Sequence, residues 1–194
     1  MQANVEQFPP HREAVTDHHG HDAQAHPEPG FWQKYIFSTD HKVIGIQYGL
    51  MSLSFMLLGF ALMLLMRWQI AHPGVPVPVF GPLLEKVLGS GVAPGGAISP
   101  ELYNSFGAMH GTIMVFFGIV PLGFAAFGNY IMPLQIGTID MAFPKLNMMS
   151  FWFFFISGVL MMYSFFSGTG AVQTGWTMYS PLASTTGMGV DNLW

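Results

Sequence analysis

Three long apolar segments, separated by polar and proline-rich stretches, dominate the pattern of this chain. They lie at residues 43–66, within 102–133 and within 146–171. Each contains the roughly 20 apolar residues that a helix needs to cross a bilayer. Apolar side chains occur on all faces of each segment, as expected for helices in a membrane. The pattern predicts an all-α integral membrane protein with three transmembrane helices, at about residues 43–67, 103–133 and 146–171.

The stretches outside these segments are polar or rich in turn-forming residues. Residues 1–30 are polar and contain four prolines and five histidines. They cannot bury a core, so a disordered His-rich tail is predicted, acting either as a metal-binding or pH-sensing segment or as a plain solvated extension. Residues 68–101 are rich in Pro and Gly and are predicted to be mostly irregular.

Composition excludes several classes of protein. Only 8% of the residues are charged and mean hydropathy is +0.42, whereas soluble domains carry roughly 25% charged residues. The chain has no Cys, which excludes disulfides, iron–sulfur clusters, thiolate metal sites and Cys-attached haem. Its net charge of −4 gives no basis for binding nucleic acid, so no nucleic-acid partner is expected.

Basic residues near the segment ends predict the orientation, because cytoplasmic loops carry an excess of Lys and Arg. Four of them precede the first segment or lie between the second and third, and two lie on the other side: Arg12, Lys34, Lys42 and Lys145, against Arg67 and Lys86. We therefore expect the N-terminus and the loop that contains Asp140 to lie on the inner side of the membrane.

One imidazole and one carboxylate mark candidate sites, because ionisable groups are unfavourable in lipid. His110 lies one or two turns into the second segment, and Asp140 follows that segment. A single His can supply one axial bond to a haem iron. The alternative for His110 is a hydrogen bond to a neighbouring helix. Asp140 lies between Asn129 and Asn147, whose amides can order a water chain, or it caps the start of the third helix.

Two further side chains lie near the predicted membrane surface. Arg67 ends the first segment at the depth of His110, where it either extends to the lipid headgroups or contacts a buried cofactor. Trp176 follows the third segment, and a Trp at this depth is typically an interfacial anchor. Its indole N–H could also donate to a carboxylate of a cofactor.

Five ordered strings carry more information than these single residues. They are FSTDHKVIG (37–45), YNSFGAMH (103–110), FGNYIMPL (127–134), DMAFPKLN (140–147) and GWTMY (175–179). Together they closely resemble subunit I of the haem–copper terminal oxidases, in the cytochrome c oxidase type. The resemblance covers about residues 31–190 and implies the first three of twelve core helices. The chain is therefore expected to be an N-terminal fragment of such a subunit.

The resemblance implies a role for each candidate residue. His110 matches an axial ligand of the low-spin haem, expected to be of the haem a type, and Arg67 matches the Arg at its formyl-bearing edge. Tyr103 and Trp176 match residues near the same haem, with Trp176 near its propionates. The proton-uptake pathway has three matches, its entrance carboxylate and two amides of its first water-ordering stretch: Asp140, Asn129 and Asn147.

At the level of the intact protein, the resemblance implies a respiratory enzyme that passes electrons from cytochrome c to oxygen and translocates protons. It implies a copper-bearing subunit II and other oxidase subunits as partners, in contact with membrane lipid. The ligands of the high-spin haem and copper belong to later helices, so the fragment alone is not expected to be active. The alternatives are a quinol-oxidising relative, a non-catalytic three-helix protein for assembly or metal handling, and a small haem protein that uses His110 alone.

Three positions depart from the family pattern. Gln69 stands where many relatives have a Glu that helps to bind a structural calcium or sodium ion, so no such ion is expected. Met148 and Ser180 replace an Asn and a Pro.

Overall fold

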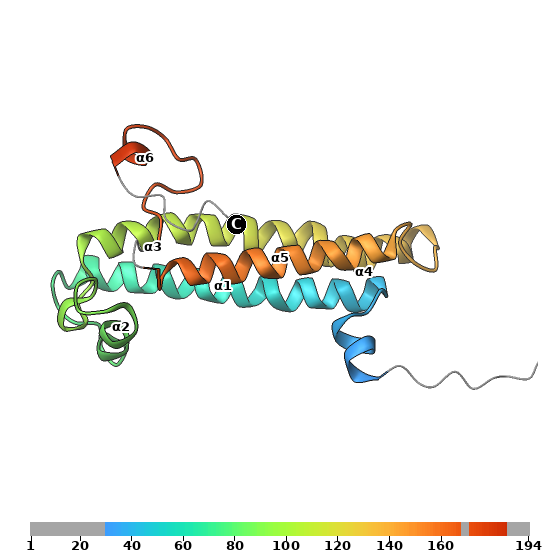
Figure 1. The fold of residues 1–194 in the computed structure, drawn as a ribbon, viewed down its shortest axis with the longest axis horizontal. Coiled ribbons are helices and arrows are strands. Elements are labelled where there is room, and N and C mark those ends of the chain that lie inside the picture. Colours follow the sequence, from blue (N-terminus) through green and yellow to red (C-terminus); the bar gives the residue numbers. More distant parts are fainter. Residues whose placement is uncertain (1–29, 168–170, 186–194) are drawn as a thin grey trace, which may run out of the picture.

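Three long helices run side by side in the computed structural model, which describes residues 30–167 and 171–185 (Figure 1). They are α1 (His41–Ala71), a continuous helix over Pro100–Ile136 and α5 (Pro144–Ser164). Each is long and apolar enough to cross a membrane, and the described residues contain no β-strand. The all-α membrane fold with three spans is therefore confirmed. The predicted tail lies outside the described residues, apart from Gly30.

The second span combines four helical elements. It begins with α3 (Pro100–Thr112), continues as the π-helical segments η3 (Ile113–Ile119) and η4 (Pro121–Ala126), and ends with α4 (Phe127–Ile136). Ser99 is the N-cap of this span, and its side chain accepts a hydrogen bond from the backbone N–H of Leu102. Gly137 ends it with a left-handed φ of 72°, a conformation that glycine adopts without steric cost.

Two predicted boundaries were wrong. The third helix ends at Ser164 and not near residue 171, because its last turn tightens. The Phe165 N–H bonds Met162 O at 3.4 Å and the Ser164 hydroxyl bonds Met161 O at 2.6 Å. The first helix continues to Ala71, four residues beyond the prediction.

The connection between the first two spans is less irregular than predicted. It contains α2 (Gly81–Leu88) and the short 3₁₀ turn η2 (Pro94–Gly96). Leu84 and Leu88 of α2 pack against the buried core, which explains why this stretch folds despite its prolines. Two further short elements flank the spans, η1 (Trp32–Ile36) and α6 (Leu182–Thr185).

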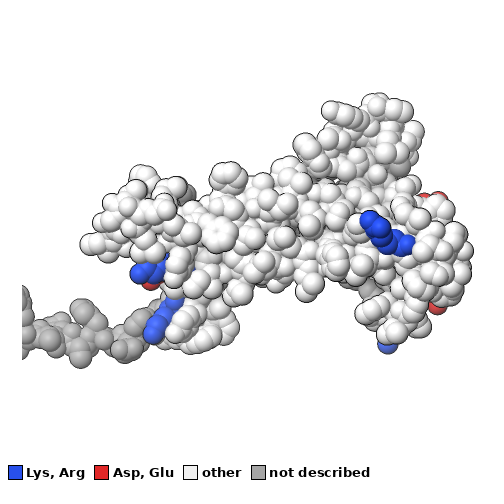
Figure 2. Space-filling model, turned by 180° about the vertical axis from the view of Figure 1, so that it is seen from behind, with Lys and Arg blue, Asp and Glu red and all other residues white. Residues whose placement is uncertain are grey.

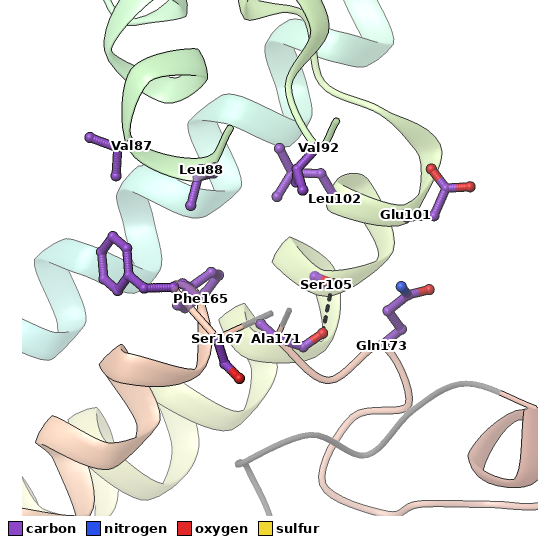
Figure 3. A pocket seen from close by; sticks show the side chains of 11 residues that line it. Val87, Leu88, Val92, Glu101, Leu102, Ser105, Phe165, Ser167, Ala171 and Gln173 are labelled. Carbon is purple, nitrogen blue, oxygen red and sulfur yellow. Dashed lines mark hydrogen bonds between the residues drawn. The ribbon is translucent and has the colours of Figure 1, made fainter. Parts of the chain in front are cut away.

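The bundle has two ends, which we call the α2 end and the Asp140 end. At the α2 end the chain after α5 is tied to α3, where Ser105 Oγ donates to Ala171 O at 3.0 Å (Figure 3). A cavity of about 330 Å³ lies beside this bond, between α2, α3 and the end of α5. Lys and Arg side chains gather towards the two ends of the visible face and leave its middle free of charge (Figure 2). This distribution is expected of helices that cross a bilayer.

Candidate functional site

His110 is held by α1 through a hydrogen bond of its ring. Its Nδ1 lies 2.8 Å from the backbone carbonyl oxygen of Gly59. A carbonyl oxygen only accepts, so Nδ1 carries a proton, and in the neutral imidazole Nε2 then keeps its lone pair. The sequence left open whether His110 bonds a neighbouring helix or binds a metal. The structure shows the first, and this bond is also the one that orients metal-binding histidines, so it is compatible with the second.

The surface beside His110 is open. A Cβ placed on Gly111 would meet no atom within 4 Å, and one on Gly107 would meet only Met66 Sδ, at 3.6 Å. Tyr103 lies two turns before His110, on the same side of the helix and half-buried. A half-buried imidazole with a free Nε2 beside two bare glycines fits the flat face of a haem.

Arg67 lies at nearly the same level of the bundle as His110. The approach of Met66 of α1 to Gly107 places Met66 one turn from His110, and Arg67 is the next residue. Arg67 is exposed. Its guanidinium is therefore accessible to lipid headgroups and to a group bound beside His110.

Trp176 packs against the side of the second span. Its ring meets Phe116 edge to face, with 5.4 Å between the ring centroids. Phe116 lies six residues further along the span than His110. Trp176 remains 56% exposed. Its indole is therefore still accessible to a further group besides Phe116.

At the Asp140 end, the two predicted amides meet directly. Asn147 Nδ2 donates to Asn129 Oδ1 at 2.6 Å, and Asn129 Nδ2 donates to Ala125 O at 2.7 Å. Asn129 is buried, with 7% of its surface exposed, while Asn147 is half-buried. The pair joins the second span to α5 and places amide donors and acceptors at the Asp140 end of the bundle.

Asp140 does not cap the third helix. Its Oδ1 accepts a hydrogen bond from the backbone N–H of Met141 at 2.7 Å. α5 begins later, at Pro144, with Phe143 before it and no side-chain cap. The capping alternative was therefore wrong, because the intervening residues form a bend and not a helix. Asp140 is half-buried and lies in the loop between the second span and α5.

Sequence reasoning missed three polar residues near this amide pair. His41 is 2% exposed, and its Nδ1 lies 2.8 Å from the backbone carbonyl oxygen of Asn129. Tyr48 Oη lies 3.0 Å from Ser150 Oγ, which in turn donates to the carbonyl of Asn147 at 2.6 Å. The spacing of His41 and Tyr48, seven residues apart on one helical face, was the available signal.

The two groups of residues are well separated along the second span. His110 and Asn129 are 19 residues apart, which corresponds to roughly 28 Å of helix. Among the described residues no group of three or more His, Cys, Asp or Glu could hold a metal ion.

Comparison with known proteins identifies relatives over most of the chain. Residues 43–194 match the family described as Cytochrome C and Quinol oxidase polypeptide I. The chain is 41% identical over 169 residues to cytochrome c oxidase subunit 1 of Synechocystis, with 87% of this chain and 26% of the relative covered. It is 38% identical to the same subunit of Thermostichus vulcanus, covering 87% of this chain and 27% of that protein.

A third relative, cytochrome c oxidase subunit 1 of Corynebacterium glutamicum, is 37% identical over 89% of this chain and 28% of its own length. The chain thus spans about a quarter of the length of these curated relatives. With three membrane-length helices and a family match over most of its residues, the chain belongs to the cytochrome c and quinol oxidase polypeptide I family.

Proposed function

We propose that this chain is the N-terminal part of the catalytic subunit of a respiratory oxidase that passes electrons from cytochrome c to oxygen. The intact enzyme reduces oxygen to water and translocates protons across the membrane. The names of the relatives, cytochrome c oxidase subunit 1, support cytochrome c over quinol as the electron donor. The observation that carries the proposal is the His110 imidazole, oriented by Gly59 O with its Nε2 free.

In this proposal the α2 end contacts the low-spin haem, of the haem a type. A haem bound there supplies one-electron redox chemistry. His110 Nε2 would be its axial ligand, and the open surface at Gly107 and Gly111 would lie beside it. Arg67 contacts the formyl-bearing edge, while Tyr103 and Trp176 lie near the ring and its propionates. Arg67 and the Trp176 indole are both exposed and can therefore reach a bound group.

The Asp140 end takes up protons from the inner side of the membrane, where the N-terminus also lies. Asp140 receives the proton, and the Asn129–Asn147 pair orders the first waters beyond it. The direct bond between the two amides supports this role, because each amide offers both donors and acceptors. The bonded Tyr48 and Ser150 lie next in line from Asn147.

The rest of the machinery lies in other parts of the enzyme. The high-spin haem and copper bind to residues of later helices, so these 194 residues alone do not reduce oxygen. The partners are a copper-bearing subunit II, further oxidase subunits, cytochrome c and membrane lipid. Exposed apolar side chains along all three spans are consistent with lipid and with further helices around them.

Two substitutions in the intact oxidase test the two ends separately. Asp140→Asn removes the carboxylate and is expected to slow proton uptake and turnover at least tenfold, while the haem spectra stay unchanged. His110→Ala is expected to abolish the low-spin haem absorption. The measurements are oxygen consumption with reduced cytochrome c, proton uptake by stopped flow, and the reduced-minus-oxidised spectrum.

Asp40→Asn is a matched control for Asp140→Asn. Asp40 is a carboxylate at the same end of the bundle, and it accepts from the Lys42 N–H as the N-cap of α1. Asn caps a helix as well as Asp does, so this change removes a charge without loss of the cap. Turnover that falls equally in both variants, or in neither, would contradict a specific role for Asp140.

A further inference from the structure

The short helix η1 is fixed to the bundle beside the start of α1. The Gln47 side-chain amide of α1 donates to the backbone carbonyls of Tyr35 and Ile36, at 2.6 and 3.0 Å. Phe37, the residue after η1, stacks on Trp152 of α5, with 5.1 Å between the ring centroids. Figure 1 shows η1, in blue, off the side of the bundle at the end where α1 begins. Contacts with two spans therefore hold η1 in one place.

The position of Gln47 along α1 gives the depth of η1 in a membrane. α1 has 31 residues, or roughly 46 Å of helix, whereas the hydrocarbon core of a bilayer is about 30 Å thick. About 8 Å at each end of a centred, upright α1 therefore lies in the headgroup layer. Gln47 follows His41, the first residue of α1, by six residues, or roughly 9 Å. The carbonyls that it binds, and η1 with them, therefore lie close to the boundary between headgroups and hydrocarbon.

An exposed aromatic cluster with one cation beside it covers η1, and we call Phe31, Trp32, Lys34 and Tyr35 the η1 surface. Phe31, Trp32 and Tyr35 are 65%, 67% and 46% exposed. The Phe31 ring centroid lies 6.2 Å from that of Trp32 and 5.2 Å from that of Tyr35, so the rings are continuous. The Lys34 Nζ lies 5.5 Å from the Tyr35 ring centroid. Trp and Tyr rings concentrate at the headgroup level of membranes, which is the depth found for η1.

Charge at this end of the bundle favours an anionic partner. The described residues here include three exposed lysines, Lys34, Lys42 and Lys145. They also include two carboxylates that already accept backbone N–H groups, Asp40 from Lys42 and Asp140 from Met141. The positive charge is therefore in excess, and Lys34 lies directly beside the aromatic rings. Basic residues at this depth are attracted to anionic phospholipids.

We propose that the η1 surface is an interfacial anchor that binds an anionic phospholipid. The Lys34 ammonium bonds the lipid phosphate, while the aromatic rings lie against the glycerol and the first carbons of the acyl chains. Apolar contact and charge attraction add in such binding. Because interfacial aromatic and basic residues set the tilt of a span, the anchor also orients α1. This anchor depends on the three membrane spans and on neither the haem nor the proton role in the proposed function.

Photo-crosslinking of the intact oxidase in lipid nanodiscs tests this anchor. The nanodiscs contain equal amounts of phosphatidylglycerol and phosphatidylcholine, each with a photoreactive group on the acyl chain close to the glycerol. Mass spectrometry then counts the adducts of each lipid on the peptide that contains η1. In the unmodified enzyme we expect adducts on this peptide, with phosphatidylglycerol in excess.

Two variants separate the charge from the rings. Lys34→Gln should lower the excess of phosphatidylglycerol about fivefold, which corresponds to the roughly 1 kcal/mol that one basic residue contributes near an anionic surface. Lys86→Gln is the matched control, because it removes an exposed lysine at the α2 end and should leave the excess unchanged. Trp32→Ala combined with Tyr35→Ala removes two of the rings and should lower the adducts of both lipids.

Two results would overturn the inference. If no lipid is crosslinked to η1 in the unmodified enzyme, the η1 surface faces water or another protein. If Lys34→Gln and Lys86→Gln show the same excess of phosphatidylglycerol, Lys34 does not bind the phosphate. The reduced-minus-oxidised spectrum of the same samples reports haem loading. A normal spectrum without adducts therefore contradicts this inference alone, whereas a missing low-spin haem in the unmodified enzyme contradicts the proposed function alone.

Discussion

Replacing Gly59 by Ala tests how α1 holds the His110 imidazole. A Cβ at this position would lie 2.7 Å from Met114 Sδ, 3.0 Å from Met114 Cγ and 3.4 Å from Ile113 Cγ2. The first contact is shorter than real Cβ atoms tolerate, so Met114 or α1 has to move. Because Gly59 O is the acceptor of the His110 Nδ1–H at 2.8 Å, a shift of α1 stretches that bond.

The energy of this change has two parts. Overpacking a well-packed contact costs about 1–3 kcal/mol, and weakening one hydrogen bond costs about 1 kcal/mol. The hydrogen bond increases the basicity of a metal-bound imidazole and so favours oxidised iron. For a one-electron couple, about 1 kcal/mol corresponds to about 40 mV. For the low-spin haem that we propose His110 binds, we expect Gly59→Ala to raise the midpoint potential by tens of millivolts and to lower thermal stability.

A spectroelectrochemical titration of the intact oxidase measures this shift. Gly49→Ala is the control, because its Cβ would lie in ordinary contact with Ala126, at 3.7 Å. Adding Met114→Ala to the Gly59→Ala variant removes the steric conflict and should restore most of the potential. The reasoning fails if Gly59→Ala titrates like Gly49→Ala, or if the double variant shows no recovery.

Three further substitutions are expected to lower stability, each measured by thermal unfolding of the intact subunit. Gly137→Ala forces a side chain into the left-handed conformation at φ 72° and should cost about 1–2 kcal/mol. Gly128→Ala, inside the helix with open space around it, should cost nothing. Asn129→Ala removes the acceptor of the Asn147 amide and should cost about 1 kcal/mol. Its effect should not add to that of Asn147→Ala, and full additivity would show that the two amides are not coupled. Tyr48→Phe removes the bond to Ser150 but keeps the ring contacts, so it should cost about 1 kcal/mol. An unchanged unfolding temperature would show that this bond does not stabilise the bundle.

Much of the fold followed from composition and periodicity. Three membrane-length apolar segments predicted three spans, because only a helix satisfies its own backbone groups in lipid. Helix ends were less predictable, since they depend on local bonds such as the one from the Ser164 hydroxyl to Met161 O. Helix α2 was not predicted. Its stability comes from packing on core residues that are distant in the sequence, and the local pattern of Pro and Gly does not reveal this packing.

The candidate site was likewise predictable from the sequence only in part. Amino-acid type alone identified His110 and Asp140, because an imidazole and a carboxylate stand out in an apolar chain. The partner of His110 could not be predicted, since Gly59 contributes only a backbone carbonyl and lies 51 residues away. The capping alternative for Asp140 failed for a related reason, because the residues after it form a bend before Pro144.

The sequence by itself determined that this is an all-helical membrane protein, and its motifs indicated the oxidase subunit I family. Those properties depend on residue type and order, which one chain displays in full. Tertiary structure alone decided which groups meet: Asn147 with Asn129, and His110 with Gly59. These contacts depend on the register between helices, and that register is set by small residues such as Gly45, where the backbones of α1 and the second span approach closely.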